Sequence, residues 1–208
     1  MKHFFKNTET GRSMVEVMGY MVVSMFLIAG VAKIVTSAYG EYKLSQASMQ
    51  LSDLAKTIVK VSAADTDYRN TIENIKDYLP KSYRVVGDNI YNVFGGQVEI
   101  RVPDYEFSGH PGDQFSITYS ELDRDQCIAL MTKDWINNRV VDLDYIRLEN
   151  EKTSTSGKYW YWPVYHPASS GDYELPVKMA DVAGTDGKTD DSGNALCLSS
   201  NKITWVFN

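Results

Sequence analysis

The first part of the chain carries a long run without charge. No charged residue occurs over residues 17–32, and Lys33 closes the run. As an α-helix these 16 residues rise about 24 Å, less than the roughly 30 Å hydrocarbon core of a bilayer. One tilted helix over residues 12–35 makes up the difference, so we expect this segment to cross a membrane. The basic residues ahead of the run are Lys2, Lys6 and Arg12. By the positive-inside rule they orient this end toward the cytoplasm and the rest of the chain outside the inner membrane.

After this run the pattern becomes that of an amphipathic helix. Apolar residues recur at steps of three and four, which predicts one buried face. They are Leu44, Ala47, Leu51, Leu54, Ile58 and Val61, and the predicted polar face is Ser45, Gln46, Gln50, Asp53, Lys56 and Lys60. Because no proline precedes Pro80, one helix can continue over residues 12–64. Gly30 and Gly40 are its weak points, each costing up to about 1 kcal/mol relative to alanine.

The pattern along residues 65–208 predicts one folded α+β domain, which we call the head. Residues 65–79 have helical spacing and stop at Pro80, and shorter runs that alternate apolar and polar residues follow. Gly95-Gly96 lies between two such runs and indicates a hairpin. The predicted strands are 83–86, 90–94, 98–102, 115–119 and 204–207, and the predicted helix 121–135 has Ser120 as its N-cap. We expect a twisted antiparallel sheet packed against the long helix.

Composition excludes some classes of protein. Hydrophobic residues at 43% and aromatic residues at 12% indicate a folded domain in this 208-residue chain. The net charge is −6, and it becomes −7 without residues 1–11, which carry +2 and −1. Such an acidic chain has no electrostatic footprint for nucleic acid, so we expect no specific nucleic-acid partner.

The two cysteines, Cys127 and Cys197, lack the short spacing of a zinc site or a redox pair. In an exported protein they would form a disulfide, which stabilises by about 4 kcal/mol for a loop of 70 residues in the entropic model. The alternative is two buried free thiols.

Glu16 stands at the start of the uncharged run. An unpaired carboxylate there costs a few kcal/mol, so we expect it to have a partner. One interpretation is a capping box with Ser13, because the two residues have the S-x-x-E spacing. The other depends on Gly11: cleavage after it would leave Arg12 as the amino terminus and Glu16 as the fifth residue.

The stretch Gly11-Arg12-Ser13-Met14-Val15-Glu16, with the apolar run behind it, resembles the prepilin signal of type IV pilins and pseudopilins. The resemblance implies that residues 1–11 are a leader, removed after Gly11 by a prepilin peptidase that also methylates the new amino terminus. It further implies that residues 12–35 form the membrane and filament-core part. Glu16 would then pair with the terminal amine of a neighbouring subunit. Arg12 stands where the family usually has an apolar residue.

Three stretches of the body look like the type IVb pilins, and in particular like the thin-pilus subunits of conjugative plasmids and their chromosomal relatives. They are Asn92-Val93-Phe94-Gly95-Gly96, Phe115-Ser116-Ile117-Thr118-Tyr119 and Asn201-Lys202-Ile203-Thr204. The resemblance implies a Cys127–Cys197 disulfide that bounds a variable region, residues 127–197. It implies a structural subunit, without cofactor or catalytic residue, that polymerises with itself through the inner-membrane assembly machinery. The product would be an extracellular pilus used in conjugation or cell adhesion.

Three other hypotheses remain at this point. A type II secretion pseudopilin or a minor, adhesive tip pilin would share the same signal. An ordinary secretory signal could be cleaved near Gly30-Val31-Ala32, although a charged Glu16 does not suit its apolar region. The chain could also be a membrane-anchored periplasmic enzyme or binding protein, which would not need the Gly11 and Glu16 signal.

The sequence offers little catalytic chemistry. It has no HExxH, GxSxG or P-loop motif, and of its three histidines His3 lies in the leader and His110 and His166 each precede a proline. Asp142 and Asp144 are typical of a solvated strand or helix face.

Two further stretches allow two interpretations each. The aromatic residues 159–165 suit a strand with one buried face, or an exposed contact surface. Residues 181–193 are rich in oxygen ligands and glycine, but they lack the spacing of an EF-hand, so a surface loop is favoured over a calcium site.

Overall fold

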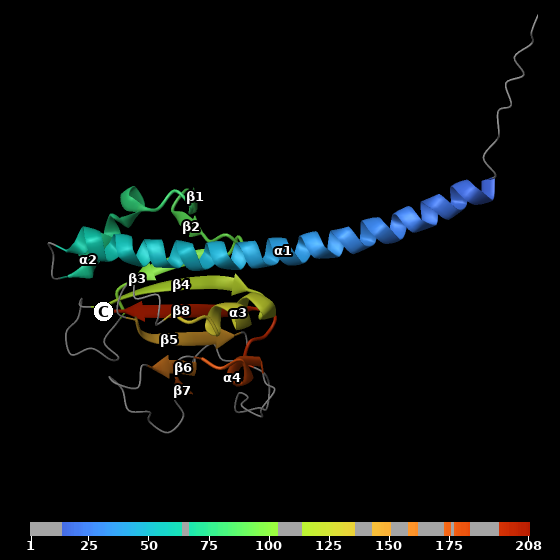
Figure 1. Ribbon diagram of the computed structural model, residues 1–208. Helices are drawn as coiled ribbons and strands as arrows, with labels where there is room; N and C mark the ends of the chain where they lie inside the picture. The colour runs from blue at the N-terminus through green and yellow to red at the C-terminus, as the bar shows by residue number, and fades with distance from the viewer. Residues whose placement is uncertain are drawn as a thin grey trace, which may run out of the picture. The chain divides into compact units, whose positions relative to one another are not determined.

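The computed structural model divides the chain into two compact units, residues 1–42 and residues 43–208 (Figure 1). The structure describes residues 14–63, 67–103, 114–135, 143–150, 158–161, 173–175, 177–183 and 196–208.

Helix α1 (Met14–Ser62) confirms the predicted long helix. All of its side chains over residues 14–42 are exposed. In the second unit the helix buries one face, which includes Ala47, Leu51, Leu54 and Ile58 as predicted. The prediction was wrong for Gln50, which is only 5% exposed. Its side chain donates to the carbonyl of Ser82 and accepts from the amide of Val93, so a polar residue joins the buried face by satisfying two backbone groups.

The helix predicted over residues 65–79 is two short helices. Helix α2 (Tyr68–Glu73) is followed by a 3₁₀ turn, η1 (Ile75–Tyr78), with Asn74 between them. Asp67 begins α2 by accepting a hydrogen bond from the amide of Arg69 at 2.9 Å. The apolar spacing marked the buried side, and Ile75 is indeed buried, but it did not reveal the break.

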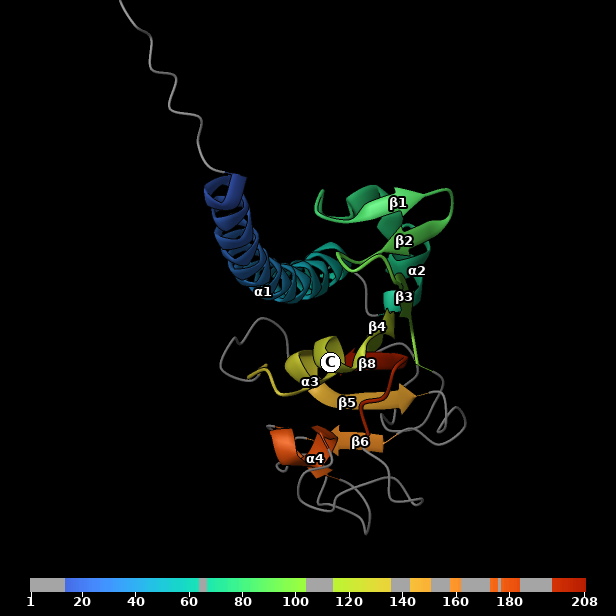
Figure 2. The same ribbon diagram turned by 90° about the vertical axis from the view of Figure 1, so that its right-hand side faces the viewer.

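The head contains an eight-stranded sheet in the order β1-β2-β3-β4-β8-β5-β6-β7, which can be followed from β1 to β6 in Figure 2. The strands are β1 (Arg84–Val86), β2 (Asn89–Tyr91), β3 (Gln97–Arg101), β4 (Phe115–Leu122), β5 (Leu143–Asn150), β6 (Lys158–Tyr161), β7 (Tyr173–Glu174) and β8 (Asn201–Phe207). Each pair is antiparallel except β6 with β7. The predicted antiparallel sheet is therefore confirmed, with one parallel edge pair in addition. The last strand, β8, lies between β4 and β5.

Alternation along the central strands builds the core. Phe115, Ile117 and Tyr119 on β4 are fully buried, and so is Trp205 on β8. The ring centroid of Trp205 lies 5.4 Å from that of Tyr119 and 5.5 Å from that of Trp135, both in edge-to-face arrangements. These residues, the buried face of α1 and the buried side of α3 (Arg124–Met131) form one hydrophobic cluster.

A pair of buried hydroxyl groups connects α1 with the sheet. The hydroxyl oxygens of Tyr83 and Tyr119 lie 2.7 Å apart, and the Tyr119 hydroxyl donates to the carbonyl of Ala47 at 3.4 Å. Burial raises the pKa of both phenols above the ordinary 10.0, and a hydrogen bond from Tyr83 opposes part of that rise at Tyr119. The phenols therefore stay neutral and hydrogen-bonded at physiological pH.

The predicted hairpin is confirmed between β2 and β3. The side-chain oxygen of Asn92 accepts from the amides of Phe94 and Gly96 at 2.9 and 3.2 Å. Gly95 adopts φ +96°, which side chains disfavour, and a Cβ on Gly96 would lie 2.0 Å from the carbonyl oxygen of Ser120 on β4. Both glycines are thus required, the first by its backbone angle and the second by close approach of another strand.

The N-cap predicted for α3 was wrong. Ser120 belongs to β4, which continues to Leu122. Asp123 caps the helix in a capping box: its carboxylate accepts from the amide of Gln126, whose side chain accepts from the amide of Asp123. The reciprocal bonds explain why the helix begins at Arg124.

Strand β5 was not predicted as an element, and Asp144 on it is not solvated. Asp144 is 4% exposed, and the side-chain amide of Gln114 donates to its carboxylate at 2.8 Å. The expectation for Asp144 is therefore corrected, while Asp142 lies outside the described residues. For the aromatic stretch, residues 159–161 belong to β6, as the strand interpretation expected; residues 162–165 lie outside the described part.

Candidate assembly helix and disulfide

Residues 14–42 of α1 form an uncovered apolar helix. Their large hydrophobic side chains are exposed, among them Met25 at 68%, Phe26 at 75% and Ile28 at 69%. In the part of the chain that the structure describes, α1 is the one helix whose length and apolar composition would allow it to cross a membrane. A contiguous apolar surface of this size is typical of a membrane or subunit contact.

Glu16 lies in the first turn of α1 and is exposed. The hydroxyl of Tyr20 donates to its Oε1 at 3.4 Å, one turn farther along the helix. Tyr20 was not predicted as a partner of Glu16, although a donor four residues after a carboxylate lies on the same helix face. The predicted cleavage site, Gly11 and Arg12, and the predicted capping partner Ser13 lie outside the described residues, so the leader and the capping box stay predictions.

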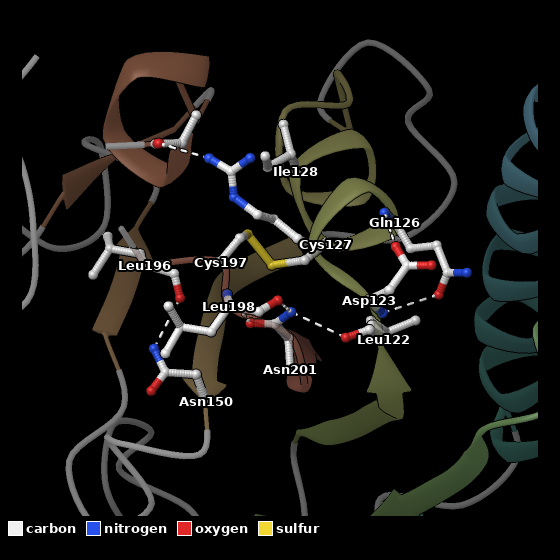
Figure 3. The surroundings of a disulfide bond; sticks show 12 residues. Leu122, Asp123, Gln126, Cys127, Ile128, Asn150, Leu196, Cys197, Leu198 and Asn201 are labelled. Atoms are coloured by element: carbon white, nitrogen blue, oxygen red, sulfur yellow. Dashed lines mark hydrogen bonds between the residues drawn. A yellow bond between two sulfur atoms is a disulfide. The ribbon is translucent and has the colours of Figure 1, made fainter. Parts of the chain in front are cut away.

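The predicted disulfide is confirmed. Cys127, from α3, and Cys197, ahead of β8, are bonded, with their Cα atoms 5.8 Å apart (Figure 3). Both cysteines are fully buried. The amide of Cys197 also donates to the carbonyl of Val182 in α4 (Met179–Ala183) at 3.1 Å. The segment around Cys197 is therefore joined to α3 by the disulfide and to α4 by a backbone hydrogen bond.

Two buried asparagines surround the disulfide, and sequence analysis did not assign them a role (Figure 3). The Asn201 side chain accepts from the amide of Leu198 at 2.8 Å and donates to the carbonyls of Leu122 and Leu198 at 3.0 and 2.7 Å. Asn150 donates to the carbonyl of Leu196 at 2.8 Å. The segment around Cys197 is thus held to β4 and β5 by side-chain amides that satisfy its backbone.

The described residues contain no group of three histidine, cysteine, aspartate or glutamate side chains placed to hold a metal ion. Of the oxygen-rich stretch 181–193, residues 181–183 end helix α4, so the loop interpretation was wrong for them, and the rest lies outside the described part. His3, His110 and His166 also lie outside it.

Comparisons with known proteins point in one direction. Residues 41–138, which are 98 of the 208, match the family model described as PilS N terminal. No curated protein matches the sequence. The solved structures similar to the chain include a type IV b pilin from Salmonella typhi, with 14% identity over 78% of this chain and 99% of that chain and a TM-score of 0.42. That score is too low to decide the fold or the class. The family match confirms the resemblance of this chain to type IV pilins.

Proposed function

We propose that this pilin-like chain is the precursor of a structural subunit of a type IVb-like pilus. A prepilin peptidase removes residues 1–11, and residues 12–35 carry the subunit from the inner membrane into the core of an extracellular filament. The observation that supports this most is the uncovered apolar helix over residues 14–42, continuous with a helix segment that is packed into a folded head. An enzyme or binding protein that is only anchored in a membrane would not need the Gly11 and Glu16 signal ahead of this helix.

The two parts of the chain have separate roles in this proposal. Before assembly the apolar part of α1 is surrounded by lipid, and in the filament it packs against the same segment of neighbouring subunits. Because lipid is as apolar as leucine, the change gains little from the hydrophobic effect and depends on close packing and on polar pairs. The head, closed by the Cys127–Cys197 disulfide, forms the outer layer, and the solvent-facing side chains of the region 127–197 lie on the filament surface.

Glu16 supplies the polar pair. Its carboxylate pairs with the amino-terminal amine of Arg12 on an adjacent subunit. In a low-dielectric core this pairing disfavours subunits that are out of register. Tyr20 covers one carboxylate oxygen in the single chain at 3.4 Å, which lowers the cost of holding Glu16 near lipid before the partner arrives. The partners in this scheme are other copies of the chain, the peptidase and the inner-membrane assembly machinery.

Substitution of Glu16 tests the pairing. Loss of one member of a buried ion pair costs about 3–5 kcal/mol, a factor of a hundred or more in subunit affinity. Glu16→Ala should therefore be processed normally and yet be depleted from filaments, as measured by immunoblots of whole cells and of sheared filaments. Glu41→Ala, which removes an exposed carboxylate from the same helix, is the matched control and should be incorporated normally. Normal piliation with Glu16→Ala would refute the pairing.

Intact mass and amino-terminal sequencing of sheared surface material test the whole proposal. We expect a chain that begins at Arg12, carries one disulfide and is enriched in filaments; an additional 14 Da would report methylation of its amine, since one methyl replaces one hydrogen. A dominant share of surface protein would indicate the major subunit rather than a minor tip pilin or a pseudopilin. A chain that begins at Met1 or Lys33, or that is absent from the surface, would overturn the proposal.

A further inference from the structure

Three hydroxyl groups of the apolar helix donate to acceptors of the helix itself. Ser24 donates to the carbonyl of Tyr20 at 2.7 Å. Thr36 donates to two carbonyls of the preceding turn at 2.9 and 3.1 Å. Tyr20 donates to Glu16. Because unsatisfied polar groups are costly in hydrocarbon, a helix with these internal bonds can lie in lipid without a polar partner from outside.

Lys33 is the exception in this part of the helix. It is the one charged residue of the sequence between residues 17 and 36, and its ammonium has to reach water or phosphate. Its four methylene groups allow it to do so from about one turn inside the hydrocarbon edge. If the hydrocarbon begins at Val17, a length of about 30 Å ends near Thr36, three residues beyond Lys33. This places Lys33 within reach of the outer headgroups.

Two exposed tyrosines follow at the next positions. Tyr39 and Tyr42 are 58% and 56% exposed. They lie three residues apart and therefore on one helix face, about 5 and 9 Å past Thr36. Tyrosine is enriched at the level of the headgroups, where its ring meets acyl chains and its hydroxyl meets water.

The uncovered part of the helix also ends here. Side chains are exposed through Tyr42 and become half-buried at Lys43, where the second unit begins. The 29 residues from Met14 to Tyr42 rise about 43 Å, which matches the 40–45 Å thickness of a bilayer with its headgroup layers.

We propose that Lys33, Tyr39 and Tyr42 form an outer anchor that binds the phospholipid headgroup layer and fixes the depth of the helix before assembly. Residues 14–42 then traverse the whole bilayer, seven residues beyond the segment 12–35 expected from the sequence. This inference rests on the proposed membrane-inserted precursor. It adds a step to assembly, because the outer anchor has to leave the headgroups when the subunit is extracted.

Spin labels on introduced cysteines test the depth. Both native cysteines are in the disulfide, so a new cysteine is the single free thiol. The labelled variants are Val23→Cys, Ala38→Cys and Met49→Cys, each in the full chain reconstituted into phosphatidylethanolamine–phosphatidylglycerol vesicles. Val23 and Met49 are similarly exposed, at 58% and 54%, so they serve as matched references for hydrocarbon and water. The measurement is label accessibility to oxygen, which enters lipid, and to a water-soluble nickel chelate.

The outer anchor predicts an accessibility at position 38 between those at 23 and 49. Adding Tyr39→Ala and Tyr42→Ala should shift position 38 toward the value at 49, whereas Tyr39→Trp with Tyr42→Trp should keep the original value. A label at 38 that already matches 49, or that does not respond to the alanine pair, would overturn the outer anchor while leaving membrane insertion in place. A label at 23 that matches 49 would overturn the proposed membrane-inserted precursor itself.

Discussion

The buried hydroxyl pair between Tyr83 and Tyr119 makes a quantitative prediction about how the head holds α1. In Tyr119→Phe, the head loses the 2.7 Å bond between the two hydroxyls and the 3.4 Å bond to the carbonyl of Ala47. The remaining Tyr83 hydroxyl is then buried without this partner, since Tyr83 is only 7% exposed. An orphaned buried donor costs about 1–3 kcal/mol, so we expect the free energy of unfolding to fall by that amount.

The double variant Tyr83→Phe with Tyr119→Phe isolates the pair. Removing both hydroxyls leaves no orphaned donor of this pair, so the double variant should be no less stable than Tyr119→Phe alone. The interaction energy of the double-mutant cycle is then about 1 kcal/mol or more.

Urea unfolding of the full chain in a mild detergent measures this cycle. Tryptophan fluorescence reports the transition, because Trp205, one of four tryptophans, is fully buried and its ring lies 5.4 Å from that of Tyr119. Tyr78→Phe is the control, since Tyr78 is 53% exposed and should be unchanged within about 0.5 kcal/mol. Additive losses from the two single variants would refute the argument, because they would mean that the hydroxyls act independently.

The same pair sets the alkaline limit of stability. Burial holds the pKa of both phenols above 10.0 in the folded chain, whereas the unfolded chain releases its protons near that value. The contribution is therefore fully present below about pH 10 and is lost as the pH rises further. Alkaline unfolding should be less steep in the double phenylalanine variant, and an unchanged pH profile would contradict the raised pKa values.

Other parts of the head give three more predictions. Gly96→Ala should lower the free energy of unfolding by about 1–3 kcal/mol, since the new Cβ meets a backbone carbonyl of β4. Gly87→Ala, at φ +59° with open space around it, should lower it by about 1–2 kcal/mol and keep native packing. NMR checks this, and equal chemical-shift changes around β4 in the two variants would contradict the steric argument. Reduction of the disulfide, or Cys127→Ser, should lower the free energy of unfolding by about 2–5 kcal/mol in thermal melts, and no change would show that the loop is not entropically restrained. Asn201→Ala removes the side chain that bonds three backbone groups near Cys197, so the free energy of unfolding should fall by about 1–3 kcal/mol. Dithiothreitol should also reduce the disulfide faster; an unchanged reduction rate would show that Asn201 does not protect the disulfide.

Local periodicity predicted much of the fold. The three- and four-residue steps over Leu51, Leu54 and Ile58 identified the buried face of α1, and alternation at 115–119 identified β4. Such patterns are visible because one face of each element meets the core. The disulfide was also predictable, since two cysteines allow one intramolecular pairing.

Predictions failed where a distant part of the chain decides the environment. Gln50 has the sequence position of a solvated residue, but its partners are the backbone of Ser82 and Val93, more than 30 residues away. Asp144 is buried because β5 lies beside the C-terminal strand, a pairing that local spacing does not encode. The pairing of Tyr20 with Glu16 was within reach, because only the helical period is needed to find it.

The position of β8 has a consequence for the order in which the head can form during synthesis. β4 and β5 do not pair with each other, and both pair with β8, which begins at Asn201, whereas β5 ends at Asn150. Without that last strand, β1 to β4 and β5 to β7 have no strand that joins them into one sheet. The head can therefore complete its sheet only after its C-terminal residues have been synthesised. A chain interrupted within the last strand lacks the link between β4 and β5. Under the proposed function, such a chain would be open to proteolysis before it could enter a filament.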